Sequence, residues 1–277
     1  MNSQCNPKRA LFTGVRTPFV GLLFLLLSLG ANAALAAPTA DVVARYPHDP
    51  DAFTQGLLIW HGALYESTGQ YGVSTLRRVD LHSGRVRAQH VLSGLYFGEG
   101  LARYDQRLYQ LTWKAGMVFL YDARTLAPAG HLSYQGEGWG LARCGDTLAM
   151  SNGSATLRFR DPETFKVRRQ ITVTDDDRPL ARLNELEVIH GLIWANVWQT
   201  DRIVVIDPST GRVVGGLDAG ALSAEQPAGA DVLNGIAYDT AGHRIYLTGK
   251  YWSTLYALGN DPDPAQSVPA SHRCPAR

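Results

Sequence analysis

Polar and aromatic side chains recur in this sequence at one equivalent position of five similar segments. The residues at that position are Gln55, Glu99, Trp139, Asn184 and Asn234, with spacings of 44, 40, 45 and 50 residues. A repeat that serves only packing would place the same small or apolar residue in every copy. A carboxylate can transfer protons, and amides and indoles can bind a polar substrate. This mixture therefore predicts one shared and chemically varied pocket.

A second equivalent position lies near the end of each segment. It holds Gly69, Trp113, Gly153, Trp198 and Lys250. A lysine at the end of a strand is commonly a surface residue, but this one shares its position with two tryptophans. Lys250 is therefore either a surface lysine or a cation of the shared pocket, and both readings stay open at this point. The remaining tryptophans Trp60, Trp194 and Trp252 have no such equivalence, and we expect them to serve packing.

Familiar catalytic and cofactor motifs are absent from the sequence. No group of histidines and cysteines has metal-ligand spacing. Neither a Gly-x-Ser-x-Gly elbow nor a phosphate-binding or dinucleotide-binding glycine motif occurs. The count of Lys+Arg, 26, nearly equals that of Asp+Glu, 25, so the sequence offers no basic surface for nucleic acid. We expect no nucleic-acid partner.

The elements that carry these positions predict the fold. Each segment is an apolar strand, a turn and a second apolar strand. In the first four copies a third strand follows, then a turn of the form Asp-x-x-Ser/Thr and a fourth strand. Repeats of about 40–50 residues built from short strands are typical of β-propellers. We predict an all-β, five-bladed propeller in which both equivalent positions face the central channel. The segments are Phe53–Ser67, Phe97–Leu111, Gly138–Ser151, Leu183–Val197 and Leu233–Thr248.

The last repeat lacks a fourth strand of its own. Ser253–Leu258 runs into a proline-rich stretch at 260–264, and such sequence ends strands. Val42–Tyr46, near the start, is a strand without a blade. We predict that this N-terminal strand completes the last blade and closes the ring, which also covers exposed strand edges.

Residues 1–37 are typical of a secretory signal peptide. Lys8 and Arg16 precede the apolar run Pro18–Leu29, and an Ala-x-Ala cleavage site follows. The run is short for a membrane span of about 20 residues, so we prefer cleavage over an uncleaved anchor. Cleavage would leave 38–277 as a single propeller domain, periplasmic or secreted, with no membrane attachment.

Two cysteines remain after the leader, because Cys5 lies within it. Cys144 and Cys274 either pair, as an oxidising compartment allows, or stay apart as a buried thiol and a residue of a loose tail. The sequence leaves both readings open. The acidic run Asp175–Asp177 we interpret as a solvated turn in preference to a calcium loop.

Several motifs of this chain match one known family in order and spacing. They are Tyr46-Pro-His-Asp-Pro-Asp-Ala-Phe-Thr-Gln-Gly-Leu57, Phe97-Gly-Glu-Gly100, Leu111-Thr-Trp-Lys114, Gly136-Glu-Gly-Trp-Gly140, Leu183-Asn-Glu-Leu-Glu187, Trp194-Ala-Asn-Val-Trp198 and Thr248-Gly-Lys250. In them the chain resembles the plant and bacterial type of glutaminyl-peptide cyclotransferase, over essentially the whole mature sequence. The resemblance implies a five-bladed propeller that converts N-terminal glutamine into pyroglutamate with release of ammonia. It is distinct from the zinc-dependent animal type, which has an α/β fold.

The resemblance also implies which residues form the site. Carried over position by position, the family's active site falls on Phe53, Gln55, Phe97, Glu99, Trp113, Trp139, Asn184, Trp198 and Lys250. The resemblance assigns Asn234 less firmly. The implied partners are peptides or proteins with an N-terminal glutamine. We expect no cofactor and a monomer.

The reaction requires the α-amine to attack the γ-carboxamide carbon of the same glutamine. One carboxylate can take a proton from the amine and give it to the leaving ammonia, and we assign this role to Glu99. Lys250 would stabilise the oxyanion or tune Glu99, and both roles stay open. Gln55 and Asn184 would bond the carboxamide or the peptide backbone, while the aromatic residues fold the side chain toward ring closure. This scheme needs no metal.

Two other functions fit a propeller. A calcium-dependent hydrolase of the lactonase kind could use Glu99, Asn184 and Asn234 as ligands, although Lys250 and the tryptophans fit it poorly. A non-catalytic binding propeller of the cell envelope is the third reading, because propellers carry many functions.

Overall fold

Apolar and β-branched residues dominate short segments of this chain, the composition that favours buried strands. A computed structural model describes residues 1–2, 38–259 and 268–275. The predicted signal peptide lies outside these residues, apart from its first two. Backbone contacts separate the chain into Met1–Ala36 and Ala37–Arg277, and the second unit holds all the strands below. Among the described residues, no helix is long and apolar enough to cross a membrane.

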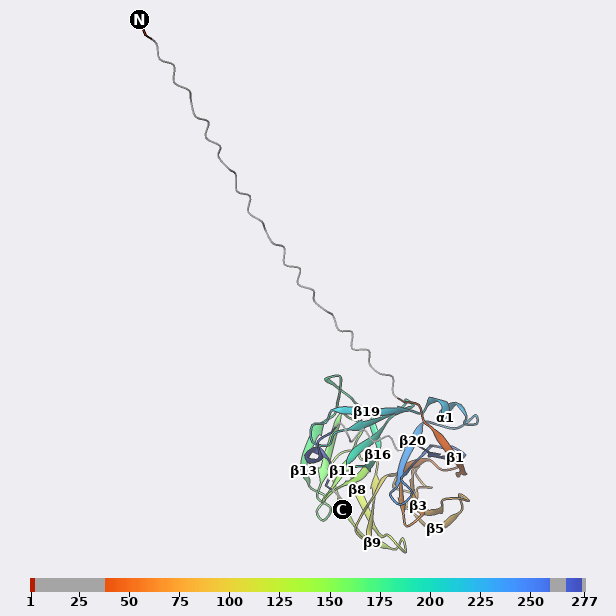
Figure 1. Cartoon of the computed structure of the whole chain (residues 1–277). Helices are drawn as coiled ribbons and strands as arrows, with labels where there is room; N and C mark the ends of the chain where they lie inside the picture. The colour runs from red at the N-terminus through yellow and green to blue at the C-terminus, as the bar shows by residue number, and fades with distance from the viewer. Residues whose placement is uncertain (3–37, 260–267, 276–277) are drawn as a thin grey trace. The chain divides into compact units, whose positions relative to one another are not determined.

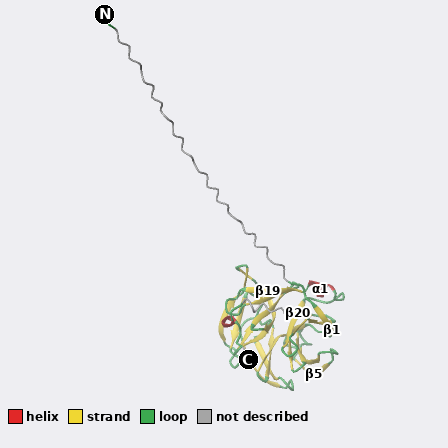
Figure 2. Cartoon of the chain, in the orientation of Figure 1, coloured by secondary structure: helices red, strands yellow, loops and turns green. Residues whose placement is uncertain are grey.

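Five four-stranded antiparallel sheets make up the second unit, one for each predicted blade. Figure 2 shows how little helix accompanies the strands. The five-bladed propeller is therefore confirmed. Blade one consists of β2 (Thr54–Trp60), β3 (Ala63–Thr68), β4 (Thr75–Asp80) and β5 (Val86–Val91), and blade two of β6 (Gly98–Tyr104), β7 (Arg107–Thr112), β8 (Met117–Asp122) and β9 (Pro128–Ser133). Blade three consists of β10 (Leu141–Cys144), β11 (Thr147–Met150), β12 (Thr156–Arg160) and β13 (Val167–Thr172), and blade four of β16 (Leu183–Ile189), β17 (Leu192–Val197), β18 (Arg202–Ile206) and β19 (Val213–Asp218).

The N-terminal strand closes the ring, as predicted. Blade five has the order β1-β22-β21-β20, so a strand from the start of the chain completes the last sheet. Tyr46 on β1 pairs with Leu255 on β22, antiparallel. The strands of this blade are β1 (Val42–Pro47), β20 (Leu233–Asp239), β21 (Arg244–Gly249) and β22 (Thr254–Leu258).

Aspartates open the turns between the third and fourth strands of four blades. They are Asp80, Asp122, Asp161 and Asp207. Asp161 Oδ1 accepts the backbone N–H of Thr164 at 2.7 Å and its hydroxyl at 3.0 Å. The N–H of Thr164 and the guanidinium of Arg168 lower the pKa of Asp161 to about 2. The Asp-x-x-Ser/Thr pattern therefore predicted the hydrogen bonds of these turns correctly.

Apolar side chains fill the spaces between neighbouring blades. Five buried clusters each combine residues from two adjacent blades. Trp194 and Trp252 are fully buried in the cluster between blades four and five, which confirms their packing role. Trp60 is only partly buried, and the guanidinium of Arg103 lies 5.0 Å from its ring centroid.

Glycines allow the first strands of neighbouring blades to approach closely at the channel. A Cβ on Gly100 would lie 2.5 Å from the carbonyl oxygen of Trp139, and one on Gly140 would lie 2.0 Å from that of Asn184. Such distances exclude any side chain. The N–H of Gly100 donates to the Trp139 carbonyl at 2.6 Å, so the close approach also bonds one blade to the next.

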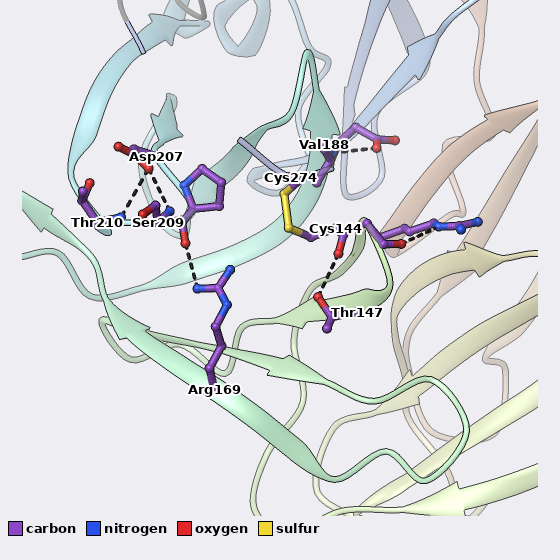
Figure 3. Close-up of a disulfide and its surroundings, with 12 residues drawn as sticks. Cys144, Thr147, Arg169, Val188, Asp207, Ser209, Thr210 and Cys274 are labelled. Carbon is purple, nitrogen blue, oxygen red and sulfur yellow. Dashed lines mark hydrogen bonds between the residues drawn. A yellow bond between two sulfur atoms is a disulfide. The ribbon is translucent and has the colours of Figure 1, made fainter. Parts of the chain in front are cut away.

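A disulfide joins Cys144 and Cys274, which settles the reading that the sequence left open. Their Cα atoms lie 4.9 Å apart, within the usual range for a disulfide. Figure 3 shows the bond beside the end of β10, where the hydroxyl of Thr147 donates to the Cys144 carbonyl at 2.8 Å. The N–H of Cys274 donates to the carbonyl of Gly191 at 2.7 Å. The C-terminal segment is thus tied to blades three and four.

The acidic run lies on a two-stranded hairpin between blades three and four. Asp177 pairs with Arg212 at 2.9 Å and Asp175 with Arg202 at 2.7 Å, on the surface. Arginine pairing and exposure agree with a solvated turn. The hairpin is formed by β14 (Thr174–Asp175) and β15 (Arg178–Pro179), and the short helices are α1 (Gly220–Ala224) and η2 (Ala270–His272).

Candidate active site

A pocket of about 290 Å³ brings together all nine residues that the sequence assigned to the site. The first-strand position supplies a carboxylate and two amides, and the second-strand position supplies indoles and a cation. One further residue, Gln70, also lines the pocket. The lining residues are Phe53, Gln55, Gln70, Phe97, Glu99, Trp113, Trp139, Asn184, Trp198 and Lys250.

β-Bulges explain why the polar residues face this pocket. The pairing register of β2 with β3 shifts between Thr54 and Gly56, so Gln55 is the extra residue. The register also shifts between Gly98 and Leu101 in β6 and between Leu183 and Leu186 in β16, and these stretches include Glu99 and Asn184. A bulge bends its strand and re-aims a side chain that regular alternation would place elsewhere. The first strand of each of these blades therefore presents its polar residue to the channel.

Glu99 and Lys250 are the two ionisable groups of the pocket that are almost fully buried, each 4% exposed. Burial raises the pKa of Glu99 well above its usual value, against the attraction of Lys250, and the charge of Glu137 raises it further. Burial lowers the pKa of Lys250, against the attraction of Glu99 and Asp231. Both groups can therefore exchange protons nearer to neutral pH than in water.

Aromatic rings line the pocket in two groups. The ring of Phe97 meets the rings of Phe53 and Trp113 edge to face, with centroids 5.8 and 5.6 Å apart. Trp139 and Trp198 form a second such pair at 5.4 Å. The ammonium of Lys250 lies 4.4 Å from the centroid of Phe53. These five rings form the apolar part of the pocket lining around the ionisable pair.

Two amides supply hydrogen-bonding groups to the pocket. The Oδ1 atom of Asn184 is buried and has no hydrogen-bond partner among the described protein groups. A buried acceptor without a partner is costly, so it favours binding a donor from a substrate. Asn234 does not line the pocket. Its side-chain NH₂ donates to Gln55 Oε1 at 3.2 Å and to the Thr54 carbonyl at 2.9 Å, so it orients Gln55.

Glu137 contributes to the site, although the sequence analysis gave it no role. Its Oε2 atom accepts the indole N–H of Trp113 at 2.9 Å and that of Trp139 at 3.0 Å. One carboxylate oxygen thus fixes two walls of the pocket and places a negative charge near Glu99. The one feature of the sequence that could have pointed to Glu137 is its position as the acidic residue of the motif Gly136–Gly140.

Glu185 is a second residue that the sequence analysis missed. It comes directly after Asn184 where the other blades have glycine, and it is fully buried. Its carboxylate accepts the N–H of Ile236 at 2.9 Å and that of Leu57 at 3.4 Å. Burial raises the pKa of Glu185 well above the usual value, and repulsion by Glu187 raises it further. Glu185 therefore joins blades one, four and five directly beside the pocket residue of blade four.

A buried ionic cluster supports blade one behind the pocket. Glu66 accepts hydrogen bonds from His48 at 3.0 Å, from the hydroxyl of Thr54 at 2.7 Å and from Arg77 at 2.9 Å. Burial opposes the ionisation of Glu66, but Arg77 and His48 keep its pKa below the usual value. His48 is thus a structural residue that shares the Glu66 Oε1 acceptor with Thr54, the neighbour of Gln55.

A second cavity of about 300 Å³ lies at the opposite ends of the first strands. It includes the turn 60–62, Arg143 and Asp239, and none of the nine predicted site residues lines it. Arg143 pairs with Asp105 at 3.2 Å and lies over the ring of Tyr104. Among the described residues, no group of three or more His, Cys, Asp or Glu side chains is arranged to hold a metal ion.

Comparison with known proteins identifies the family. The glutamine cyclotransferase family profile matches residues 23–259. Glutaminyl-peptide cyclotransferase of Arabidopsis thaliana is 44% identical over 226 residues, which cover 79% of this chain and 70% of that protein. The crystal structure of Myxococcus xanthus glutaminyl cyclase superposes with a TM-score of 0.75 at 38% identity, covering 80% of this chain and 96% of that one. The chain therefore belongs to the glutamine cyclotransferase family.

Proposed function

We propose that this pocket closes the N-terminal glutamine of peptides and proteins into pyroglutamate, with Glu99 carrying the proton. The observation that supports it most is a buried carboxylate and a buried lysine that line the same aromatic pocket. A volume of about 290 Å³ is at the small end of ligand pockets. It suits one amino-acid side chain held in a folded conformation.

The proton path begins with a neutral α-amine, whose pKa is about 7.7–8.0 in peptides. The amine nitrogen attacks the γ-carboxamide carbon, and the ionised Glu99 takes a proton from that nitrogen as the bond forms. The protonated Glu99 then gives the proton to the carboxamide nitrogen, the C–N bond breaks, and ammonia leaves. Acid–base catalysis is most efficient when the pKa of the catalytic group lies near the working pH. The raised pKa of the Glu99 carboxyl therefore suits both proton transfers.

The other pocket residues bind and shape the substrate. The unpartnered Oδ1 of Asn184 accepts an N–H of the carboxamide or the amine. Gln55, held at its oxygen by Asn234, offers its NH₂ to a substrate carbonyl. Lys250 stabilises the oxyanion that forms on the γ-carbonyl. Because the reaction is intramolecular, holding the folded conformer supplies much of the rate.

An ammonia-release assay with a glutaminyl dipeptide tests the assignment of Glu99. We expect Glu99→Gln to lose at least about 100-fold in kcat, the scale of acid–base catalysis. Glu163→Gln makes the same change in an exposed turn far from the pocket and serves as the control. Circular dichroism checks the fold of both variants. Near wild-type turnover by Glu99→Gln would show that another group moves the proton.

Family membership favours cyclisation over the two alternative functions. A calcium site would need oxygen ligands where Lys250 and the indoles stand, and a binding propeller would have no need of a buried carboxylate–lysine pair. We propose that the reaction proceeds without a metal. Activity that survives dialysis against a chelator agrees with this, and a loss restored by one added metal overturns it.

We also propose that residues 1–37 are removed on export, that the mature domain starts at Pro38, and that it is a monomer in the periplasm or outside the cell. The Cys144–Cys274 disulfide supports an oxidising compartment. Mass spectrometry of the exported protein gives the mature N-terminus, and light scattering gives the oligomeric state. An intact leader or protein retained in the cytoplasm would contradict the proposal.

A further inference from the structure

Two adjoining loops beside the pocket expose three large apolar side chains. Leu95 is 79%, Val73 66% and Tyr71 53% exposed. Leu95 and Val73 have the highest exposed fractions among the large apolar side chains described in 38–275. We call these three residues the apolar shelf. Isolated exposed apolar residues are common on proteins, but a group next to a pocket points to an interaction site.

Hydrogen bonds tie the two loops together. The N–H of Leu92 donates to the carbonyl of Ser74 at 2.9 Å, and that of Gly98 donates to the Ser74 hydroxyl at 3.0 Å. The Ser74 hydroxyl in turn donates to the Gln70 carbonyl at 2.6 Å. A Cβ on Gly94 would lie 3.4 Å from the Cα of Gly72, so the loop backbones touch. The shelf is therefore formed before any ligand arrives, which lowers the entropic cost of binding.

The shelf continues the wall of the pocket. The ring of Tyr71 meets that of Phe97 edge to face, with centroids 5.4 Å apart, and Phe97 lines the pocket. Gln70, the residue before Tyr71, also lines it. The first loop follows β3, which ends at Thr68, and the second comes before β6, so both loops lie next to the pocket residues Gln70 and Phe97. A chain that leaves the pocket along Phe97 would cross the shelf.

We propose that the apolar shelf binds the one or two residues that come after the glutamine, and that it selects peptides with apolar side chains there. The inference rests on the proposed function, because it takes the buried glutamine as the start of the bound chain. Extended chain advances about 3.3–3.6 Å per residue, so residues two and three are the first to emerge beyond the pocket. Side chains such as leucine cover the exposed carbons of Tyr71, Val73 and Leu95.

The test compares two tripeptide amides, Gln-Leu-Leu-NH₂ and Gln-Ser-Ser-NH₂, by ammonia release. We expect the wild-type kcat/KM to favour the leucine peptide by about fivefold, the effect of partly burying one such side chain. The difference should lie mainly in KM, since the shelf is remote from the reacting atoms. In Val73→Ser/Leu95→Ser the ratio should fall below about twofold. The ratio is independent of the fraction of active protein, so partial misfolding cannot imitate the result.

Val167→Ser on β13 is the matched control, because Val167 is 46% exposed and lies on blade three. We expect it to keep the wild-type ratio. Tyr71→Ser is the second shelf variant and should lower the ratio in the same direction. A wild-type ratio near one, or a ratio unchanged in the shelf variants, overturns this inference and leaves the shelf to a second copy or another protein. Failure to cyclise either peptide would overturn the proposed function itself.

Discussion

Glu99 and Lys250 line the same pocket, and burial disfavours the charged form of each. Each carries a pKa displaced toward neutrality, and each partly stabilises the charge of the other. The contributions of two such groups can be distinguished experimentally, because removing one group shifts the pKa of the other in a known direction. The substrate amine contributes the same ionisation to every variant, so a difference between pH profiles belongs to the enzyme.

Lys250→Met removes the cation and keeps a long apolar side chain. The pKa of Glu99 should rise, because the attraction that lowers it is lost. Glu99 must be ionised to take the proton, so the acid limb of kcat/KM should move to higher pH. At its plateau kcat should fall about 100-fold, the usual loss for one oxyanion donor. A plateau kcat like that of wild type would mean that Lys250 only tunes Glu99. Lys166→Met, the same change at an exposed lysine of blade three, is the control.

Glu137→Gln should shift the acid limb of the kcat/KM profile to lower pH, opposite to the shift in Lys250→Met. Removal of a like charge favours the ionised form of Glu99, so its pKa falls and activity extends to lower pH. The indoles of Trp113 and Trp139 lose a charged acceptor, and kcat/KM at the plateau should drop about three- to tenfold. The pH profile distinguishes this role from mere support of the wall. An unshifted limb, together with a lower plateau, would assign Glu137 to packing alone.

At the scale of the strand, the site depends on the glycine that comes directly after a polar or aromatic pocket residue. Gly56, Gly100 and Gly140 leave no room for a side chain, and the bulges turn Gln55 and Glu99 into the channel. The pocket residue and the glycine form one unit, since the close approach fixes the backbone from which the side chain extends. Blade four departs from this unit, because Glu185 replaces the glycine and bonds two other blades.

Gly140→Ala tests that unit. Its Cβ would lie 2.0 Å from the Asn184 carbonyl oxygen, so the first strands of blades three and four must move apart. Overpacking of this kind costs about 1–3 kcal/mol, which corresponds to a fall in Tm of roughly 3–10 °C. Activity should fall as well, because Asn184 moves. Gly220→Ala, whose Cβ would approach only side-chain atoms, is the control for thermal melting. An unchanged Tm would show that the channel tolerates a wider spacing.

Phe53 and Phe97 were implied only by the resemblance to the family. The repeat was sufficient to predict the blades and the other seven pocket residues, for one physical reason. A repeat forces equivalent positions into equivalent places, so the departures from the repeat mark the site. Glu137 lies outside both equivalent positions, and its role depends on where two indole N–H groups point, which spacing does not report. The role of Glu185 could not be predicted either, because its hydrogen-bond partners Leu57 and Ile236 are distant from it in sequence.

At the scale of the whole domain, the two ends of the propeller sequence are held in different ways. The N-terminal strand β1 is paired by backbone hydrogen bonds with β22, and strand composition predicted it. The C-terminal segment is held by the disulfide and by Val268, which packs between blades four and five. Pairing of the cysteines could not be predicted from sequence, because it depends on how the tail returns to β10.

Cys144→Ser/Cys274→Ser separates the stability of the ring from the chemistry of the pocket. The disulfide links residues 130 positions apart, and such a link contributes about 2–5 kcal/mol to the free energy of unfolding. We expect Tm to fall by roughly 5–15 °C. At 25 °C kcat/KM should stay within about twofold of wild type, because neither cysteine lines the pocket and a folded ring keeps its channel.

A reductant supplies the internal control for this experiment. It should lower the Tm of the wild-type protein toward that of the double variant and leave the variant unchanged, since only the wild type has a bond to break. Equal Tm values for the two proteins without reductant would show that the C-terminal segment adds nothing to the ring. A large loss of activity at 25 °C would show instead that the tail shapes the channel through blades three and four. We expect activity to be retained because packing between the blades determines the shape of the pocket. The disulfide at the C-terminal segment determines the temperature at which the propeller unfolds.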